Sequence, residues 1–411
     1  MKKILLYLFL TINISHAQTL EMLTQKGFEQ NLDLQILETQ YLAALERAPQ
    51  VRQLKPLEMD AGGFPLPIQT RLGPQALRIG AMQKFPWWGT LEQQGNLELA
   101  KAKALFERMA VRALDLKYEI AQAYFQLYEL LEKQKITERK LDLLESLERV
   151  ALAKVESGKA TAAAVLKVQL ETADVKQELN ILKQLEKKPK IMINQLLNRA
   201  LDVPIQMPTQ LELATIEWDK GAIENHISAQ HPILKRYRLQ QEIAQSELIV
   251  NDLSNKPSFG IGVDYIFINN RTDINFLDNG RDALQVRATL SLPIYRKQHE
   301  AKKREEQLKI ATLDQQKANS LHQFLATIEQ AFVDHENAQL RLTLYQKQQN
   351  ITQSMIRILE ANYSTANSDF EELLRLEKEL IHYDLKILQA IVQSHLAKSE
   401  ISRYIDDSRW R

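Results

Sequence analysis

Two long stretches without glycine or proline constrain this chain more than any other feature of its sequence. One lies between Gly95 and Gly158, and the other runs from Pro293 to Arg411. Glycine and proline commonly end helices, and both stretches are rich in the helix-favouring residues alanine, leucine, glutamate, lysine and glutamine. A helix over 90–156 would be about 100 Å long at 1.5 Å per residue. An ordinary compact enzyme needs no element of that length.

The second stretch carries apolar residues at heptad spacing. Leu373, Leu380 and Ile387 lie seven residues apart, and a second apolar set is shifted by one position. Two such seams predict a coiled-coil helix with neighbours on two sides. Taken alone, these helices favour a soluble coiled-coil rod.

Four shorter segments alternate between apolar and polar residues and predict strands. In the last of them, Val286 and Leu290 alternate with Arg287 and Thr289. Period two over about ten residues is typical of a strand that crosses a membrane in a barrel, with one face to lipid and one to the lumen. The predicted strands are 57–64, 77–85, 257–268 and 283–293.

Four strands cannot close a barrel on their own, because the smallest closed barrels have about eight. An open sheet edge in lipid would leave backbone groups without hydrogen bonds. Several copies of the chain must therefore contribute to one barrel. Three copies would supply twelve strands around a water-filled lumen.

Aromatic residues follow two of the predicted strands. Trp87 and Trp88 come directly after the second strand, and Tyr295 comes after the fourth. They fit an aromatic belt at a membrane interface. They fit ordinary packing at a strand-to-helix corner equally well.

The chain also repeats itself. The segment 77–88 aligns with 284–295 at a shift of 207, and Ile120 aligns with Ile328 at a shift of 208. The sequence therefore predicts two structural repeats, 18–205 and 206–411, each with a helix, a strand pair and two long helices. The long helices are predicted over 90–156 and 160–200 in the first repeat, and over 294–362 and 367–407 in the second.

The first residues have the pattern of a secretory signal peptide. Lys2 and Lys3 precede a mostly apolar run, and Ala17 ends a small-x-small cleavage motif. The apolar run is too short to span a bilayer as a helix. We expect residues 1–17 to be removed and the mature protein, beginning near Gln18, to lie outside the cytoplasm.

Composition narrows the function further. Lys plus Arg number 53 and Asp plus Glu number 52, and this balance argues against a nucleic-acid binder. The chain has no cysteine, which excludes disulfides, thiolate metal sites and a cysteine nucleophile. Its histidines lack the spacing of a helical metal pair, and no phosphate-binding or hydrolase motif is present. The sequence therefore predicts neither an enzyme nor a cofactor or metal site.

With these elements in place, the chain resembles the TolC family of outer-membrane efflux ducts. The resemblance rests on the duplicated order of helix, strand pair and long helices, and on a repeated turn at 155–158 and 363–367. The stretches 70–74 and 85–91 are similar to the CusC-like branch, which accompanies heavy-metal pumps of the resistance-nodulation-division (RND) class.

The resemblance implies a mainly α-helical fold with a membrane β-barrel. It implies a homotrimer with a twelve-stranded barrel in the outer membrane and a helical tunnel across the periplasm. The implied partners are outer-membrane lipid, a periplasmic adaptor of the membrane fusion class and an inner-membrane RND pump, with no nucleic acid.

Two groups of candidate residues follow. At the pore aperture, Glu372 matches a family acid, Arg375 stands where the family has another acid, and Asp369 lies at the same helix start. Asp369 also fits an ordinary first-turn acid that the helix dipole favours. The candidate adaptor contacts, at the two turns, are Ser157, Gly158, Lys159, Tyr363, Ala366, Asn367 and Ser368.

The expected function is that of an outer-membrane channel in a tripartite efflux system, which passively carries heavy-metal cations outward. A multidrug efflux duct and a duct for type I protein secretion would have the same fold. A soluble periplasmic coiled-coil scaffold is the alternative from another class, and the alternating strands oppose it.

Overall fold

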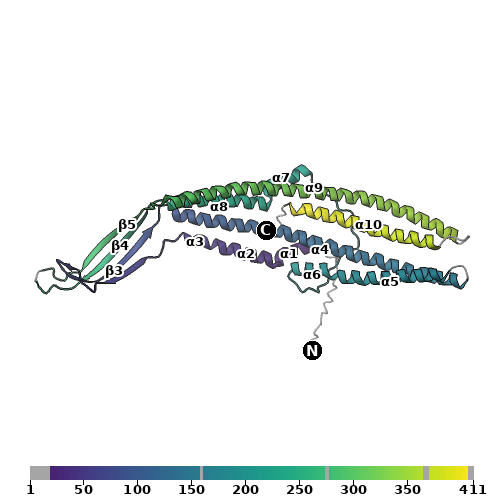
Figure 1. Ribbon diagram of the computed structural model, residues 1–411, viewed down its shortest axis with the longest axis horizontal. Coiled ribbons are helices and arrows are strands. Elements are labelled where there is room, and N and C mark those ends of the chain that lie inside the picture. The colour runs from purple at the N-terminus through teal and green to yellow at the C-terminus, as the bar shows by residue number, and fades with distance from the viewer. Residues whose placement is uncertain (1–18, 158–160, 274–276, 364–369, 406–411) are drawn as a thin grey trace, which may run out of the picture. The chain divides into compact units, whose positions relative to one another are not determined.

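The structure of this chain is a computed structural model that describes residues 19–157, 161–273, 277–363 and 370–405. The predicted signal peptide, 1–17, lies outside the described residues. The helices are α1 (Leu20–Gln30), α2 (Leu32–Leu45), α3 (Arg47–Val51), α4 (Thr90–Glu156), α5 (Ala162–Leu185), α6 (Lys187–Leu196), α7 (Lys220–Gln230), α8 (Pro232–Ser254), α9 (Arg296–Tyr363) and α10 (Phe370–Arg403). The strands are β1 (Glu58–Gly63), β2 (Gln69–Thr70), β3 (Gly73–Phe85), β4 (Ser258–Ile268) and β5 (Ala283–Ser291) (Figure 1).

The single helix predicted over 160–200 is wrong. The structure has α5 and α6 in this range, with the break at Glu186. Pro189 is the third residue of α6. Proline is tolerated in the first turn of a helix, but in the interior it removes a hydrogen bond and clashes with the preceding turn. Pro189 therefore suits the start of a new helix and not the middle of a continuous one.

The described residues form two compact units, and each takes residues from both halves of the sequence. The first contains 19–35, 110–231 and 321–405, and the second contains 36–109 and 232–320. The units therefore do not coincide with the repeats 18–205 and 206–411, which stay a prediction. None of the helices in the described part of the chain is long and apolar enough to cross a bilayer.

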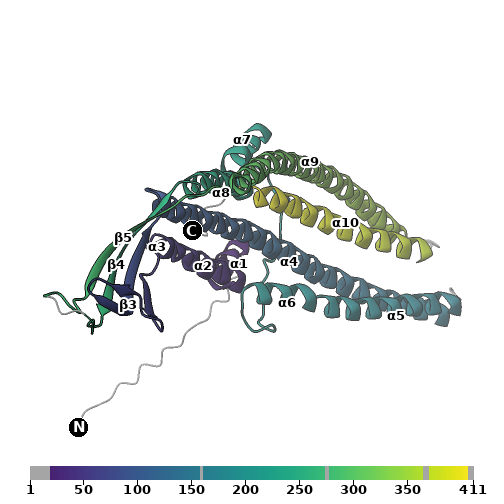
Figure 2. The same ribbon diagram turned by 60° about the vertical axis from the view of Figure 1, so that its left-hand side comes forward.

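In the first unit, α4, α5 and α10 share an apolar core. Leu144 and Leu147 of α4 pack with Val168 and Val175 of α5 and with Leu374 of α10, and all five are buried. Figure 2 shows α5 running alongside α4, and α10 alongside α9. The buried Leu374 belongs to the heptad pattern read from the sequence, so this pattern faces neighbouring helices.

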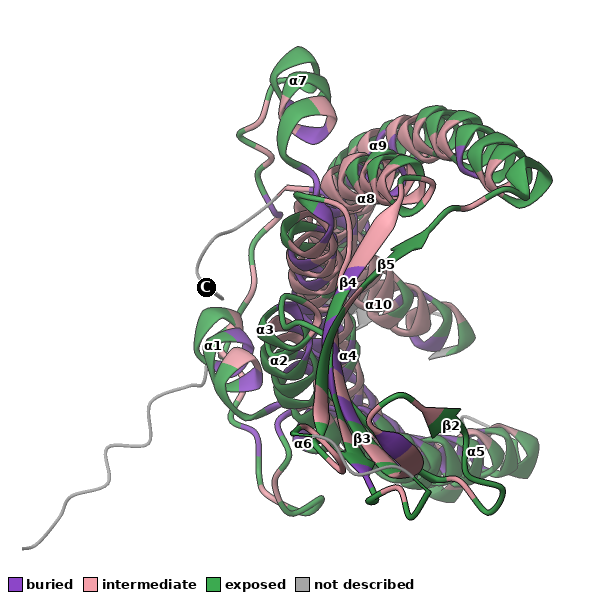
Figure 3. Ribbon diagram, turned by 90° about the vertical axis from the view of Figure 1, so that its left-hand side faces the viewer, coloured by how far each residue is buried: buried purple, intermediate pink, exposed green. Residues whose placement is uncertain are grey.

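The second unit contains an antiparallel sheet in the order β1-β3-β4-β5, with the short β2 paired to β3 off this path. The central pair, β3 and β4, joins the strands of the two sequence halves. One cross-strand row contains Asp60, Gly80, Asp264 and Gln285. Among the described residues, β1 and β5 each pair along one edge only. Figure 3 shows that β5 is exposed over most of its length.

A close backbone approach fixes the start of β3. Gly73 has φ +133°, a conformation that side chains disfavour, and a Cβ there would lie 1.9 Å from the carbonyl oxygen of Asn269. Gly62, in the same sheet, has nothing within 4 Å of its Cβ position. Gly62 can therefore serve as the control for a substitution at Gly73, because, of these two positions, an added side chain meets a clash only at Gly73.

We expect Gly73→Ala to lower the free energy of unfolding by at least about 1 kcal/mol, because strain and a backbone collision add together. Gly62→Ala should change it by less than about 0.5 kcal/mol. Urea unfolding of the purified protein in detergent, followed by circular dichroism, measures both. Equal effects of the two variants would contradict the tight approach at Gly73.

Candidate functional site

The two faces of the sheet differ sharply in chemistry. On one face the side chains of β4 and β5 are apolar and exposed, as shown by Ile261 at 59% and Val286 at 73%. The other face carries the charged residues of the strands, among them Arg78, Asp264 and Arg287. Apolar side chains left in contact with solvent over a whole face mark a surface that another phase or molecule covers.

The corner after β3 is aromatic. The rings of Trp87 and Trp88 lie 5.3 Å apart, and they contact the ring of Phe259 at 6.0 and 5.5 Å between centroids. Trp87 is half-buried in this cluster, whereas Trp88 is 73% exposed and Tyr295 is 81% exposed. Trp87 therefore packs at the corner, and Trp88 and Tyr295 are free to contact a surrounding phase.

The two described aperture candidates bind each other. The guanidinium of Arg375 donates two hydrogen bonds to the carboxylate of Glu372, at 2.9 and 2.6 Å, and a third to Glu379 at 3.1 Å. The hydrogen bond from Arg375 lowers the pKa of Glu372. Glu372 is therefore ionised but locally neutralised. Asp369 lies outside the described residues.

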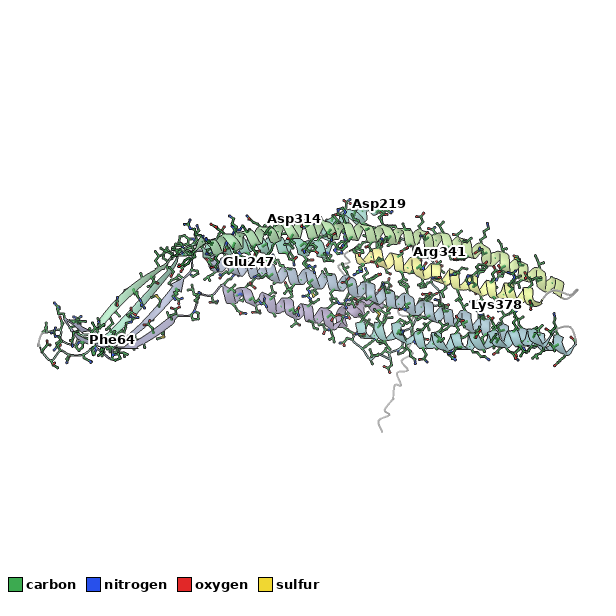
Figure 4. The ribbon with its side chains drawn as sticks, in the orientation of Figure 1. Phe64, Asp219, Glu247, Asp314, Arg341 and Lys378 are labelled. Carbon is green, nitrogen blue, oxygen red and sulfur yellow. The ribbon has the colours of Figure 1, made fainter. Side chains whose placement is uncertain are left out.

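A second charged cluster joins three helices of the first unit. Glu171 of α5 binds Lys140 of α4 at 3.2 Å and also binds Lys378 of α10, which Figure 4 labels. Burial opposes the ionisation of Glu171, but hydrogen bonds from Lys378 and Lys140 outweigh it and lower its pKa. This cluster was not predicted from the sequence, because each residue alone reads as a solvated charge on a long helix.

The candidate adaptor contacts are only partly described. Ser157 is exposed, and its backbone N–H donates to the carbonyl of Ala153 as the last turn of α4 ends. Tyr363 is the last residue of α9. Gly158, Lys159, Ala366, Asn367 and Ser368 lie outside the described residues, so their proposed contacts stay predictions.

Two histidines bind the backbone of the segment 205–219, which forms the later part of the connection between α6 and α7. The Nε2 atoms of His335 and His395 lie 2.6 and 2.8 Å from the carbonyl oxygens of Ala214 and Glu212. A carbonyl only accepts, so Nε2 carries the proton in both rings. The backbone N–H of Ala214 donates to the hydroxyl of Ser394 at 2.9 Å. The sequence did not predict this role, because the two histidines are far apart in the chain.

The described residues contain no group of three or more histidine, aspartate or glutamate side chains arranged to hold a metal ion.

Burial holds the pKa of His395 below its ordinary value of 6.5, although the bond to the Glu212 carbonyl acts in the opposite direction. The folded chain therefore takes up this proton at lower pH than the unfolded chain does. Stability from neutral His395 is complete above pH 6.5 and is lost as the pH falls below it. We expect the free energy of unfolding to fall between pH 7 and pH 5.5 less steeply in His395→Gln, whose amide keeps a donor without titrating.

The matched control is His382→Gln, because His382 is exposed on the same helix. This control should keep the pH slope of the unchanged protein. Chemical unfolding at several pH values measures the three slopes. Identical slopes in all three proteins would exclude His395 as the titrating group.

By sequence, neither a protein-family model nor a curated protein matches the chain. By structure, the chain is similar to the outer membrane protein VceC of Vibrio cholerae, with a TM-score of 0.75 and 15% identity over 94% of this chain and 96% of that one. The outer membrane channel CmeC of Campylobacter jejuni has a TM-score of 0.75 and 13% sequence identity over 94% of this chain and 85% of CmeC. CusC, whose structures concern folding and transmembrane channel formation, has a TM-score of 0.78 and 13% sequence identity over 95% of this chain and 92% of CusC. The chain therefore has the fold of TolC-like outer-membrane channel proteins, mainly helical with a small antiparallel sheet.

Proposed function

We propose that this chain belongs to the TolC family and is the outer-membrane exit duct of a tripartite efflux system. The observation that carries the proposal is a fold likeness to outer-membrane channels that covers 94% or more of the chain. The two-faced sheet supports it. An apolar exposed face suits lipid, and a charged face suits a wet lumen.

The duct is a homotrimer in this proposal. β1 and β5 each have an open edge among the described residues, and lipid would forbid such edges unless other copies pair with them. Apolar side chains are also exposed along α5, as at Leu166 and Leu170, and along α9, as at Leu340 and Ile351. These stripes favour further helix neighbours.

The proposed partners are a periplasmic adaptor and an inner-membrane RND pump, reached through the turns after α4 and α9. Exposed Ser157 and the end of α9 at Tyr363 support a contact there. The proposed aperture is formed by Glu372, Arg375 and Asp369. Because Arg375 binds Glu372 so closely, a cation-attracting ring at this level would need further acids.

The proposed cargo is heavy-metal cations, and this proposal rests only on the sequence resemblance to the CusC-like branch. The TM-scores to VceC, CmeC and CusC are nearly equal, at 0.75, 0.75 and 0.78. The fold therefore does not favour this branch over a multidrug duct or a type I secretion duct.

Two neighbouring residues of β5 test the lipid-facing surface. Val286 is 73% exposed on the apolar face, and Gln285 is exposed on the charged face. The proposed trimer should run in gels of outer-membrane fractions as an oligomer that dissociates on heating. We expect Val286→Arg to abolish this oligomer, because arginine on a lipid face costs about 2–4 kcal/mol near the bilayer midplane. Gln285→Arg should leave the oligomer intact. Equal tolerance of both changes would favour the periplasmic scaffold.

A susceptibility panel on a deletion strain tests the cargo. Copper, silver, zinc, cobalt and cadmium salts would be compared with dyes, detergents and antibiotics, and cellular metal would be quantified. We expect selective metal sensitivity with metal accumulation. Sensitivity to drugs alone would contradict the metal branch and leave the duct intact, and the absence of any phenotype would favour protein secretion.

A further inference from the structure

The charged face of the sheet has an ordered arrangement of signs. Every charged residue of β1, β3, β4 and β5 lies on this face, and the sign alternates from strand to strand. The six residues are Glu58 and Asp60 on β1, Arg78 and Lys84 on β3, Asp264 on β4 and Arg287 on β5. Three acids and three bases leave no net charge.

Each base binds an acid of another strand. Lys84 binds Glu58 at 2.7 Å. Arg78 binds Asp60 at 2.7 Å and lies 3.5 Å from Asp264. Arg287 of β5 lies 3.3 Å from Oδ1 of Asp264, the same carboxylate oxygen that Arg78 of β3 approaches. Asp264 is therefore the buried acid that two arginines share, and the more exposed Asp60 lies near the same two arginines.

Gly80 makes room for this arrangement. It lies between Asp60 and Asp264 in the cross-strand row. A Cβ at this position would lie 2.4 Å from Oδ1 of Asp264 and 2.7 Å from Oδ1 of Asp60. The missing side chain lets the guanidinium of Arg287, which is 3.7 Å from Asp60, reach across two strands.

The exposure of the three central residues is unequal. The side chain of Asp264 is 1% exposed, whereas those of Arg78 and Arg287 are 32% and 31% exposed. A solute passing this face would meet the arginines and the exposed Asp60, but not the buried carboxylate of Asp264. Asp264 would affect such a solute without touching it, because its negative charge offsets the positive charge of the arginines.

We propose that Asp264 is a positioning residue that, together with Asp60, neutralises Arg78 and Arg287 and thereby sets the charge selectivity of the duct at the level of the sheet. The inference rests on the proposed function, in which this face lines the lumen. Without the negative charge of Asp264, the arginine pair would leave a net positive charge on this face and favour anions. Cargo of either sign can then pass the sheet, and the sheet does not itself favour metal cations.

Single substitutions should shift selectivity in opposite directions. Asp264→Asn leaves one additional positive charge per copy and should raise the ratio of chloride to potassium permeability about threefold near 0.1 M salt. Arg287→Gln leaves one additional negative charge and should lower the ratio by a similar factor. Near 1 M salt, where the screening length is about 3 Å, both shifts should largely disappear.

The double variant Asp264→Asn with Arg287→Gln is the matched control, because it restores neutrality without restoring the ion pair. Its permeability ratio should return to that of the unchanged protein. The measurement is the reversal potential of the full chain in planar bilayers across a potassium chloride gradient. If Asp264→Asn does not assemble, Arg287→Gln still tests the sign.

The outcomes separate the two proposals. If the unchanged chain forms no pore, the proposed function fails. If it conducts but both single variants keep its permeability ratio, or both shift the ratio in the same direction, the role of Asp264 is overturned and the duct remains.

Discussion

Backbone groups at the edge of a sheet need hydrogen-bond partners, and hydrocarbon supplies none. In this chain the need falls on β1 and β5, whose outer edges are open among the described residues. A single copy of this sheet would therefore be unstable in a bilayer, because its edge groups would lack hydrogen-bond partners. The antiparallel order β1-β3-β4-β5 leaves the two open strands antiparallel to each other. In the proposed oligomer, β5 of one copy would therefore pair with β1 of the next, and the apolar face and the charged face would continue from copy to copy.

Most of the regular structure could be predicted from the sequence, because long helices and alternating strands leave strong local patterns. The helix predicted over 90–156 has those bounds, and the strand predicted over 257–268 begins one residue later. The break at Glu186 was missed although Pro189 is visible in the sequence. The start of β3 at Gly73 was missed because alternation fails at its first residues, where a bulge interrupts the pairing with β4.

The side-chain clusters were harder to predict, because they depend on which helix faces which. Glu171 binds Lys378 across two elements that no local pattern connects. A partial signal does exist. Lys167 and Glu171 align with Arg375 and Glu379 at the repeat shift of 208, so both halves carry a base followed by an acid four residues later. The histidines that bind segment 205–219 leave no such trace, since their partners are backbone carbonyls.

The crowding of carboxylates above Gly80 has a consequence for how this sheet can vary between related chains. The carboxylates of Asp60 and Asp264 converge where a side chain at position 80 would begin, so any larger residue there requires both acids to move or to be replaced. Loss of the acids would in turn leave Arg78 and Arg287 without counter-charges. A change at any one of five positions therefore affects which residues the others can carry, and these positions are 60, 78, 80, 264 and 287. Where related sequences are aligned, these five columns should change together or not at all.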